Sequence, residues 1–113
     1  MLKLLLCVRV SKEGRKAGQQ PYCEVNRPIL WPVCPRIGEN FWVSKTTDYA
    51  YDVFRVVHWP TGGHIEVVFE TDNFDDLTGL LEEEDGGWFS ADEPRDWSDI
   101  VWPKLEDHPV AWV

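Results

Sequence analysis

Alternating apolar and polar positions predict most of the regular structure in this chain. The clearest case is residues 51–70, YDVFRVVHWPTGGHIEVVFE, in which two runs of β-branched and aromatic residues flank a Pro-Thr-Gly-Gly breaker. Two such runs around a breaker predict a β-hairpin. Across the whole chain the same pattern predicts strands over about residues 2–10, 39–45, 51–59 and 64–71.

The two glycines of the breaker predict a two-residue turn, since both can adopt the positive φ that such turns require. With Gly62 and Gly63 in the turn, Arg55 lies opposite Glu70, a pair worth about 0.2–1 kcal/mol. A three-residue turn would set Arg55 against an aromatic residue instead. The two-residue register also gathers an apolar face, made of Phe54, Val56, Ile65, Val67 and Phe69.

Prolines interrupt the chain between the first predicted strand and the others. Pro28, Pro32 and Pro35 confine the extended piece PILWPV to a sheet edge or an entry arm, because proline cannot donate a ladder hydrogen bond. The preceding stretch, residues 11–21, is rich in glycine, lysine and arginine, which predicts a polar loop that faces partners.

After residue 72 the apolar spacing becomes helical. Asn73 is a favourable N-cap, apolar residues follow at helical intervals, and Gly86 suits the C-terminal end, so we expect a helix over about residues 74–85. A second short helix is expected over about residues 93–101. Strands followed by helices predict an α+β fold: a small antiparallel sheet, or a half-open SH3-like barrel, with short C-terminal helices.

Length and composition add the class of protein. The 113 residues suffice for a single domain, 1–113, and seven tryptophans with 43% hydrophobic residues indicate a folded core. The apolar run of the N-terminal MLKLLLCVRV is broken by Lys3 and Arg9 and is too short for a signal peptide or a membrane span. We therefore expect a soluble, cytoplasmic protein without a membrane segment.

The residues that most often carry catalysis or metals form no recognisable motif. Cys7, Cys23 and Cys34 are odd in number and lack CxxC spacing, so we expect small core or edge residues rather than a disulfide framework or a zinc site. His58 and His64 lie close across the predicted turn, and whether they bind a metal stays open. The serines lack a nucleophile-elbow pattern and no phosphate-binding glycine loop is present, so we expect no catalytic residues and no cofactor.

Charge is distributed unevenly along the chain. Residues 1–63 hold nine basic and five acidic residues, a balance of +4, whereas residues 64–113 hold two and fifteen, a balance of −13. This asymmetry favours a partner of positive potential and disfavours nucleic acid. The alternative interpretation is that the acidic half serves only solubility.

Seven carboxylates and no basic residue lie in DNFDDLTGLLEEEDGGW, residues 72–88. Asp72, Asp76 and Glu83 match ligand positions of an EF-hand loop, but Phe74 and Leu77 occupy positions that need an oxygen ligand and a glycine. The stretch is therefore not a calcium loop.

Four carboxylates crowd the C-terminal turn of the predicted helix, where the helix dipole opposes them. Their placement indicates a use other than stability, and tryptophan is enriched at binding hot spots. We therefore expect a non-catalytic protein-interaction module with an acidic, Trp-containing surface. A sharper hypothesis is that the protein inhibits a basic, nucleic-acid-binding partner, as immunity proteins and phage anti-defence proteins do. The sequence leaves the oligomeric state open. The predicted partner-binding residues are Asp75, Asp76, Glu82, Glu83, Glu84, Asp85 and Trp88.

A rival hypothesis is a small-barrel nucleic-acid-binding protein that uses the basic loop at residues 11–21, because small barrels bind strands through basic grooves and stacking aromatics. The acidic half of the chain argues against it. The residues concerned are Lys12, Arg15, Lys16, Arg27 and Trp31.

Residues 30–70 contain a Pro-x-x-Pro-Arg-Ile-Gly-Glu motif before a strand, followed by a strand with the spacing Tyr-x-Val-x-x-Val. In this chain the matching residues are Pro32, Pro35, Arg36, Ile37, Gly38, Glu39, Val53 and Val56. The segment resembles small β-rich proteins of bacteria and phages that carry no assigned activity. The resemblance implies a small β-rich fold and brings no catalytic residues.

Overall fold

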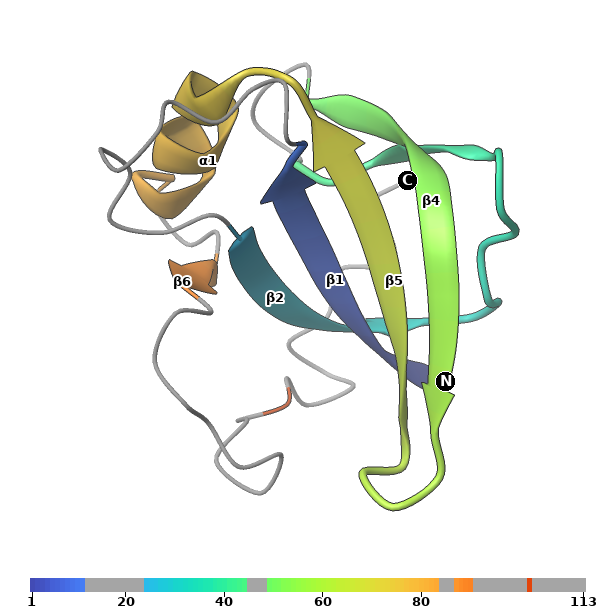
Figure 1. Ribbon diagram of the computed structural model, residues 1–113. Helices are drawn as coiled ribbons and strands as arrows, with labels where there is room; N and C mark the ends of the chain where they lie inside the picture. The colour runs from blue at the N-terminus through green and yellow to red at the C-terminus, as the bar shows by residue number, and fades with distance from the viewer. Residues whose placement is uncertain (12–23, 45–48, 84–86, 91–101, 103–113) are drawn as a thin grey trace.

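Six strands form one sheet, in the order β3-β4-β5-β1-β2-β6, and the helix α1 packs against one of its faces (Figure 1). The computed structural model describes residues 1–11, 24–44, 49–83, 87–90 and 102. The strands are β1 (Leu2–Val10), β2 (Glu24–Trp31), β3 (Asn40–Trp42), β4 (Ala50–Trp59), β5 (His64–Thr71) and β6 (Phe89–Ser90), and α1 spans Phe74–Leu81.

Strand β1 is central because it is apolar on both sides. Its residues Leu4 to Val8 are all buried, which is typical of a strand covered on both faces. Even-numbered residues such as Leu4 and Leu6 face α1, and odd-numbered residues such as Leu5 and Cys7 face away. We name these two sides of the sheet the α1 face and the Cys7 face.

The predicted small sheet with a helix is confirmed, but the sheet is mixed rather than antiparallel. Strand β1 pairs antiparallel with β2 and parallel with β5, because the β4–β5 hairpin returns to β1 with β5 running in the same direction. Strands β3 and β6 are the two edges, and no pairing among the described strands closes them into a barrel.

The proline-containing piece forms most of β2. Pro28 lies opposite Leu5 of β1, while β6 pairs with only Val25 and Asn26 on the other side. The Pro28 part of β2 is therefore next to the sheet edge, as its missing N–H requires. The strand expected over 39–45 is shorter than predicted, since β3 ends at Trp42.

The β4–β5 hairpin has a longer turn than the sequence predicted. Trp59 pairs with His64, so residues 60–63 form a four-residue loop, in which Gly63 has a φ of +67°. The register is displaced by two residues from the predicted one. Because side chains alternate with a period of two, this displacement leaves most residues on their predicted faces.

A β-bulge between Val53 and Arg55 alters the remaining part of β4. Val53 lies opposite Phe69 in the core, whereas Phe54 is 52% exposed. The prediction that Phe54 joins the apolar face is therefore wrong. The extra residue of the bulge shifts the alternation of side chains in β4, so that Val53 and not Phe54 faces the core. Arg55 lies opposite Val68, so the predicted Arg55–Glu70 pair is also wrong.

Helix α1 begins as predicted and ends earlier. The Asn73 side chain accepts a hydrogen bond from the Asp75 amide as an N-cap, and Leu77 and Leu80 are buried on the α1 face. The last helical residue is Leu81, not residue 85. Gly86 and the helix predicted over 93–101 lie outside the described residues.

The two faces of the sheet have different cores. On the α1 face the buried residues include Val8, Val25, Ile29, Phe41, Val67, Phe69 and Trp88. On the Cys7 face, Leu5, Cys7 and Val68 pack against Phe89 and Trp102. In the described residues we find no helix of the length and hydrophobicity that a membrane span needs.

Candidate functional site

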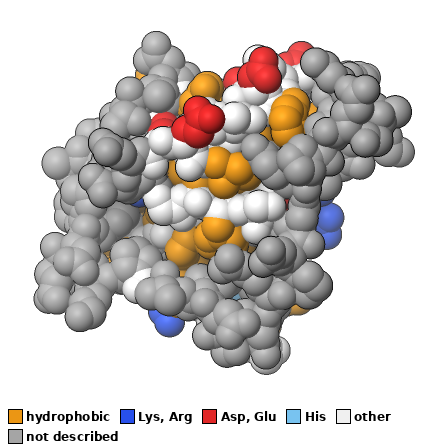
Figure 2. Space-filling model, turned by 90° about the vertical axis from the view of Figure 1, so that its left-hand side faces the viewer, with side chains coloured by type: hydrophobic (Ala, Val, Ile, Leu, Met, Phe, Trp, Pro, Cys, Tyr) orange, Lys and Arg blue, Asp and Glu red, His pale blue; other side chains and the backbone are white. Residues whose placement is uncertain are grey.

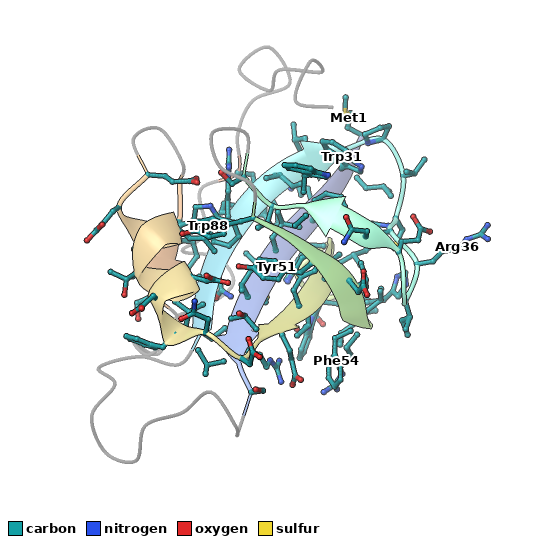
Figure 3. All side chains as sticks on the ribbon, turned by 90° about the horizontal axis from the view of Figure 1, so that it is seen from above. Met1, Trp31, Arg36, Tyr51, Phe54 and Trp88 are labelled. Atoms are coloured by element: carbon teal, nitrogen blue, oxygen red, sulfur yellow. The ribbon has the colours of Figure 1, made fainter. Side chains whose placement is uncertain are left out.

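The carboxylates predicted to bind a partner divide into two groups, and the first group holds α1 to the sheet. Asp76 Oδ2 accepts hydrogen bonds from the Tyr51 hydroxyl at 2.6 Å and from Thr71 Oγ1 at 3.0 Å. The three residues belong to α1, β4 and β5, and Tyr51 lies between the helix and the sheet in Figure 3. Asp76 therefore fixes the first turn of the helix on the sheet.

The environment of Tyr51 keeps its hydroxyl protonated. Burial raises the pKa of Tyr51 far above its ordinary value, and the hydrogen bond to Asp76 and the negative charge of Asp76 raise it further. Burial also raises the pKa of the neighbouring Tyr49, together with the charge of Asp76. Both tyrosines consequently act as neutral polar groups beneath an acidic helix.

Glu83 anchors the other end of the helix. The Ser44 hydroxyl donates a hydrogen bond to Glu83 Oε1. Burial lowers the pKa of Arg27, and the charge of Glu83 partly restores it. The hydrogen bond from Ser44 and the positive charge of Arg27 thus offset the unfavourable position of Glu83 against the helix dipole.

The second group of carboxylates points into solvent. The predicted Asp75 and Glu82 are exposed, as is Asp72, which was not predicted, and none of the three forms an ion pair within the described ranges of the chain. Figure 2 shows carboxylates gathered at the α1 end of the molecule, with Lys and Arg side chains at the margins of that view. We name Asp72, Asp75 and Glu82 the acidic surface; Glu84 and Asp85 lie outside the described residues.

Of the described tryptophans, Trp88 is not where the sequence placed it. Trp88 is only 8% exposed and belongs to the core of the α1 face, so it does not present a surface aromatic group. Trp31 is half-buried, edge-on to Phe41 with ring centroids 5.3 Å apart. Trp42 on β3 is 56% exposed. The alternation of Phe41 and Trp42 in a half-buried strand was the signal that one of these two rings faces solvent.

Trp42 points away from the side of the sheet that α1 covers, because its strand neighbour Phe41 belongs to the core of the α1 face. It precedes Ser44, the partner of Glu83, by two residues, a distance of about 7 Å in extended chain. The backbone after β3 therefore approaches the C-terminal end of α1, while the exposed indole lies on the other face of the strand.

The structure does not assemble the residues of the nucleic-acid alternative. Arg27 is half-buried, and the charge of Glu83 acts on its guanidinium, so it is not an open phosphate contact. Lys12, Arg15 and Lys16 lie outside the described residues.

The two histidines of the hairpin face opposite sides of the sheet. His58 pairs with Ile65 and therefore shares its face of the sheet. His64 is the sequence neighbour of Ile65, so its imidazole points to the opposite face. His58 is exposed, and His64 is buried with its ring stacked on Trp59 at a centroid distance of 6.5 Å. The register thus does not support a shared metal or general-base site.

A polar cluster that the sequence did not reveal lies on the Cys7 face. Cys7 Sγ and one carboxylate oxygen from each of Glu24 and Glu66 lie within 4.8 Å of one another. Cys7 is fully buried, as its prediction as a core residue required, and burial together with the charges of Glu24 and Glu66 raises its thiol pKa well above the ordinary value. No local motif could have revealed this cluster, because it depends on the pairing of three strands.

Comparison with known proteins identifies no relative: no protein-family model, curated protein or solved structure matches this chain.

Proposed function

We propose that this protein is a non-catalytic binding module that docks onto the basic surface of another protein through the acidic surface of α1. The observation that supports this most directly is the exposure of Asp75 and Glu82 without ion pairing among the described residues. Seven residues separate them, so they lie about two helical turns, or roughly 10 Å, apart along one side of the helix. Such a row suits a partner with several cationic groups.

The anchoring of α1 makes this row a rigid one. Asp76 is held by Tyr51 and Thr71 near the start of the helix, and Glu83 is held by Ser44 just after its end. A surface that is fixed before binding loses little conformational entropy in the complex. The anchoring carboxylates thus support binding indirectly, while the exposed ones supply the charge.

Trp42 is the aromatic group that we propose as an apolar contact, on the face of β3 that points away from α1. Charged rims contribute mostly to association rate and specificity, whereas buried aromatic residues contribute most of the affinity. With Trp88 in the core, Trp42 is the exposed tryptophan among the described residues. A basic, nucleic-acid-binding protein is the class of partner that we propose, with carboxylates standing in for phosphates and the bound module acting as an inhibitor.

A titration with a fluorescent nona-arginine peptide tests the position of this surface. Asp75→Asn with Glu82→Gln should weaken binding by about 2- to 30-fold, since each exposed pair contributes roughly 0.2–1 kcal/mol. The matched control, Glu39→Gln with Asp52→Asn, removes two exposed carboxylates near the β3–β4 hairpin and leaves an oxygen acceptor for Arg36 and Asn40. In Figure 3, Arg36 and α1 lie at opposite ends of the view.

The control pair should change the affinity by less than about 2-fold. Equal weakening by both pairs would mean that net charge alone attracts the peptide, and would overturn the proposal. Tight binding of a single-stranded or duplex oligonucleotide would instead favour the nucleic-acid alternative.

A further inference from the structure

The Cys7 cluster is built from three neighbouring strands. In the sheet, Arg9 of β1 pairs with Glu24 of β2, and Leu5 of β1 pairs with Glu66 of β5. Glu24 and Glu66 thus lie diagonally on either side of Cys7, on the same face. The Cys7 thiol donates a hydrogen bond to Glu66 Oε1 at 3.4 Å.

Other side chains hold both carboxylates in place. Arg9 Nη2 lies 3.4 Å from Glu24 Oε1, and Asn26 Nδ2 donates to Glu24 Oε2 at 3.1 Å. The indole of Trp59 donates to Glu66 Oε2 at 2.9 Å, which leaves Oε1 directed at the thiol. Metal-binding carboxylates are typically oriented by such outer hydrogen bonds, whose loss weakens metal binding by about 10- to 100-fold.

We propose that Cys7, Glu24 and Glu66 bind a thiophilic divalent cation of the Zn²⁺ or Cd²⁺ type. A thiolate selects these ions over Mg²⁺ and Ca²⁺, which prefer oxygen ligands alone. Tetrahedral zinc takes a sulfur at about 2.3 Å and carboxylate oxygens at about 2.0–2.2 Å, which sets neighbouring ligand atoms about 3.5 Å apart. Cys7 Sγ and Glu66 Oε1 already have this spacing at 3.4 Å, and the other pairs, which lie within 4.8 Å, need to close by at most about 1.3 Å. Water takes the fourth position.

Binding balances charge and protons. The cation displaces the thiol proton, which passes to solvent, and the two positive charges offset most of the three negative charges of one thiolate and two carboxylates. The Glu24 side chain is 23% exposed, so the ion can reach the cluster from the carboxylate side.

The full chain, stripped of metal with a chelator, is titrated with Cd²⁺ while the ultraviolet absorption of the cadmium–thiolate bond is recorded. We expect one equivalent to bind, and Zn²⁺ to compete for the same site. Cys34→Ser and Cys23→Ser should leave the absorption unchanged, and Cys7→Ser should abolish it. Glu66→Gln should keep the thiol and weaken binding by about 10-fold or more.

Circular dichroism establishes that each variant is folded, and if Cys7→Ser does not fold, Glu66→Gln and Glu24→Gln carry the test. The proposal is overturned if the folded wild-type chain develops no thiolate absorption. It is equally overturned if the absorption survives in Cys7→Ser, or if both glutamine variants bind as tightly as wild type.

Discussion

Removal of the Tyr51 hydroxyl tests whether α1 is held to the sheet as described. In Tyr51→Phe, Asp76 loses a donor at 2.6 Å and keeps the one from Thr71 at 3.0 Å. Hydrogen bonds to charged groups contribute about 1.5–3 kcal/mol. Because Asp76 is half-buried and water can take the vacated position, we expect the lower end of this range, about 1.5 kcal/mol.

Urea denaturation followed by tryptophan fluorescence measures this loss of unfolding free energy. With a urea dependence of about 1.5 kcal/mol per M, the midpoint should fall by about 1 M. Tyr49→Phe is the matched control, since it removes the same atom from a neighbouring tyrosine that is also half-buried. It should cost less than about 0.5 kcal/mol. Equal effects of the two substitutions would refute the anchoring role of the Tyr51–Asp76 hydrogen bond.

Two further predictions concern the bulge and the tyrosine pKa. Val53→Ala should lower the unfolding free energy by about 2 kcal/mol, because it leaves a cavity opposite Phe69. Phe54→Ser should change the unfolding free energy by less than about 0.5 kcal/mol, since Phe54 is exposed. Equal losses of the two variants in urea denaturation would contradict the bulge. Folded Tyr51 keeps its proton above pH about 10, where the unfolded chain releases it, so stability should fall as pH rises past that value. Tyr51→Phe should show a shallower fall, and an unchanged slope would contradict the assigned pKa direction.

Much of the sheet was predictable because half-buried strands impose a period of two on the sequence. The predicted hairpin strands agree with β4 and β5 to within one residue, and a turn of the wrong length left most facings intact. The bulge was not predictable, because the side of the sheet that Phe54 faces depends on how β4 pairs with β5 and not on the sequence of β4 alone. The parallel pairing of β1 with β5 likewise joins segments about 60 residues apart.

The acidic stretch was predicted as one surface, but the structure divides it. Asp76 and Glu83 meet hydroxyls of Tyr51, Thr71 and Ser44, which other strands or their flanking residues carry to the helix. Local sequence identifies a carboxylate and a helical position, and it does not identify which of them meets a donor from elsewhere. Trp88 shows the same limit, because its burial depends on the tertiary packing of the α1 face.

The salt dependence of nona-arginine binding tests most directly whether the acidic surface of α1 is the docking surface. Between about 50 and 200 mM salt, wild type and Glu39→Gln/Asp52→Asn should lose affinity with the same steep slope, because exposed charge is screened over about 10 Å. Asp75→Asn/Glu82→Gln should bind more weakly and show a clearly shallower slope. An identical slope for all three proteins would contradict the account.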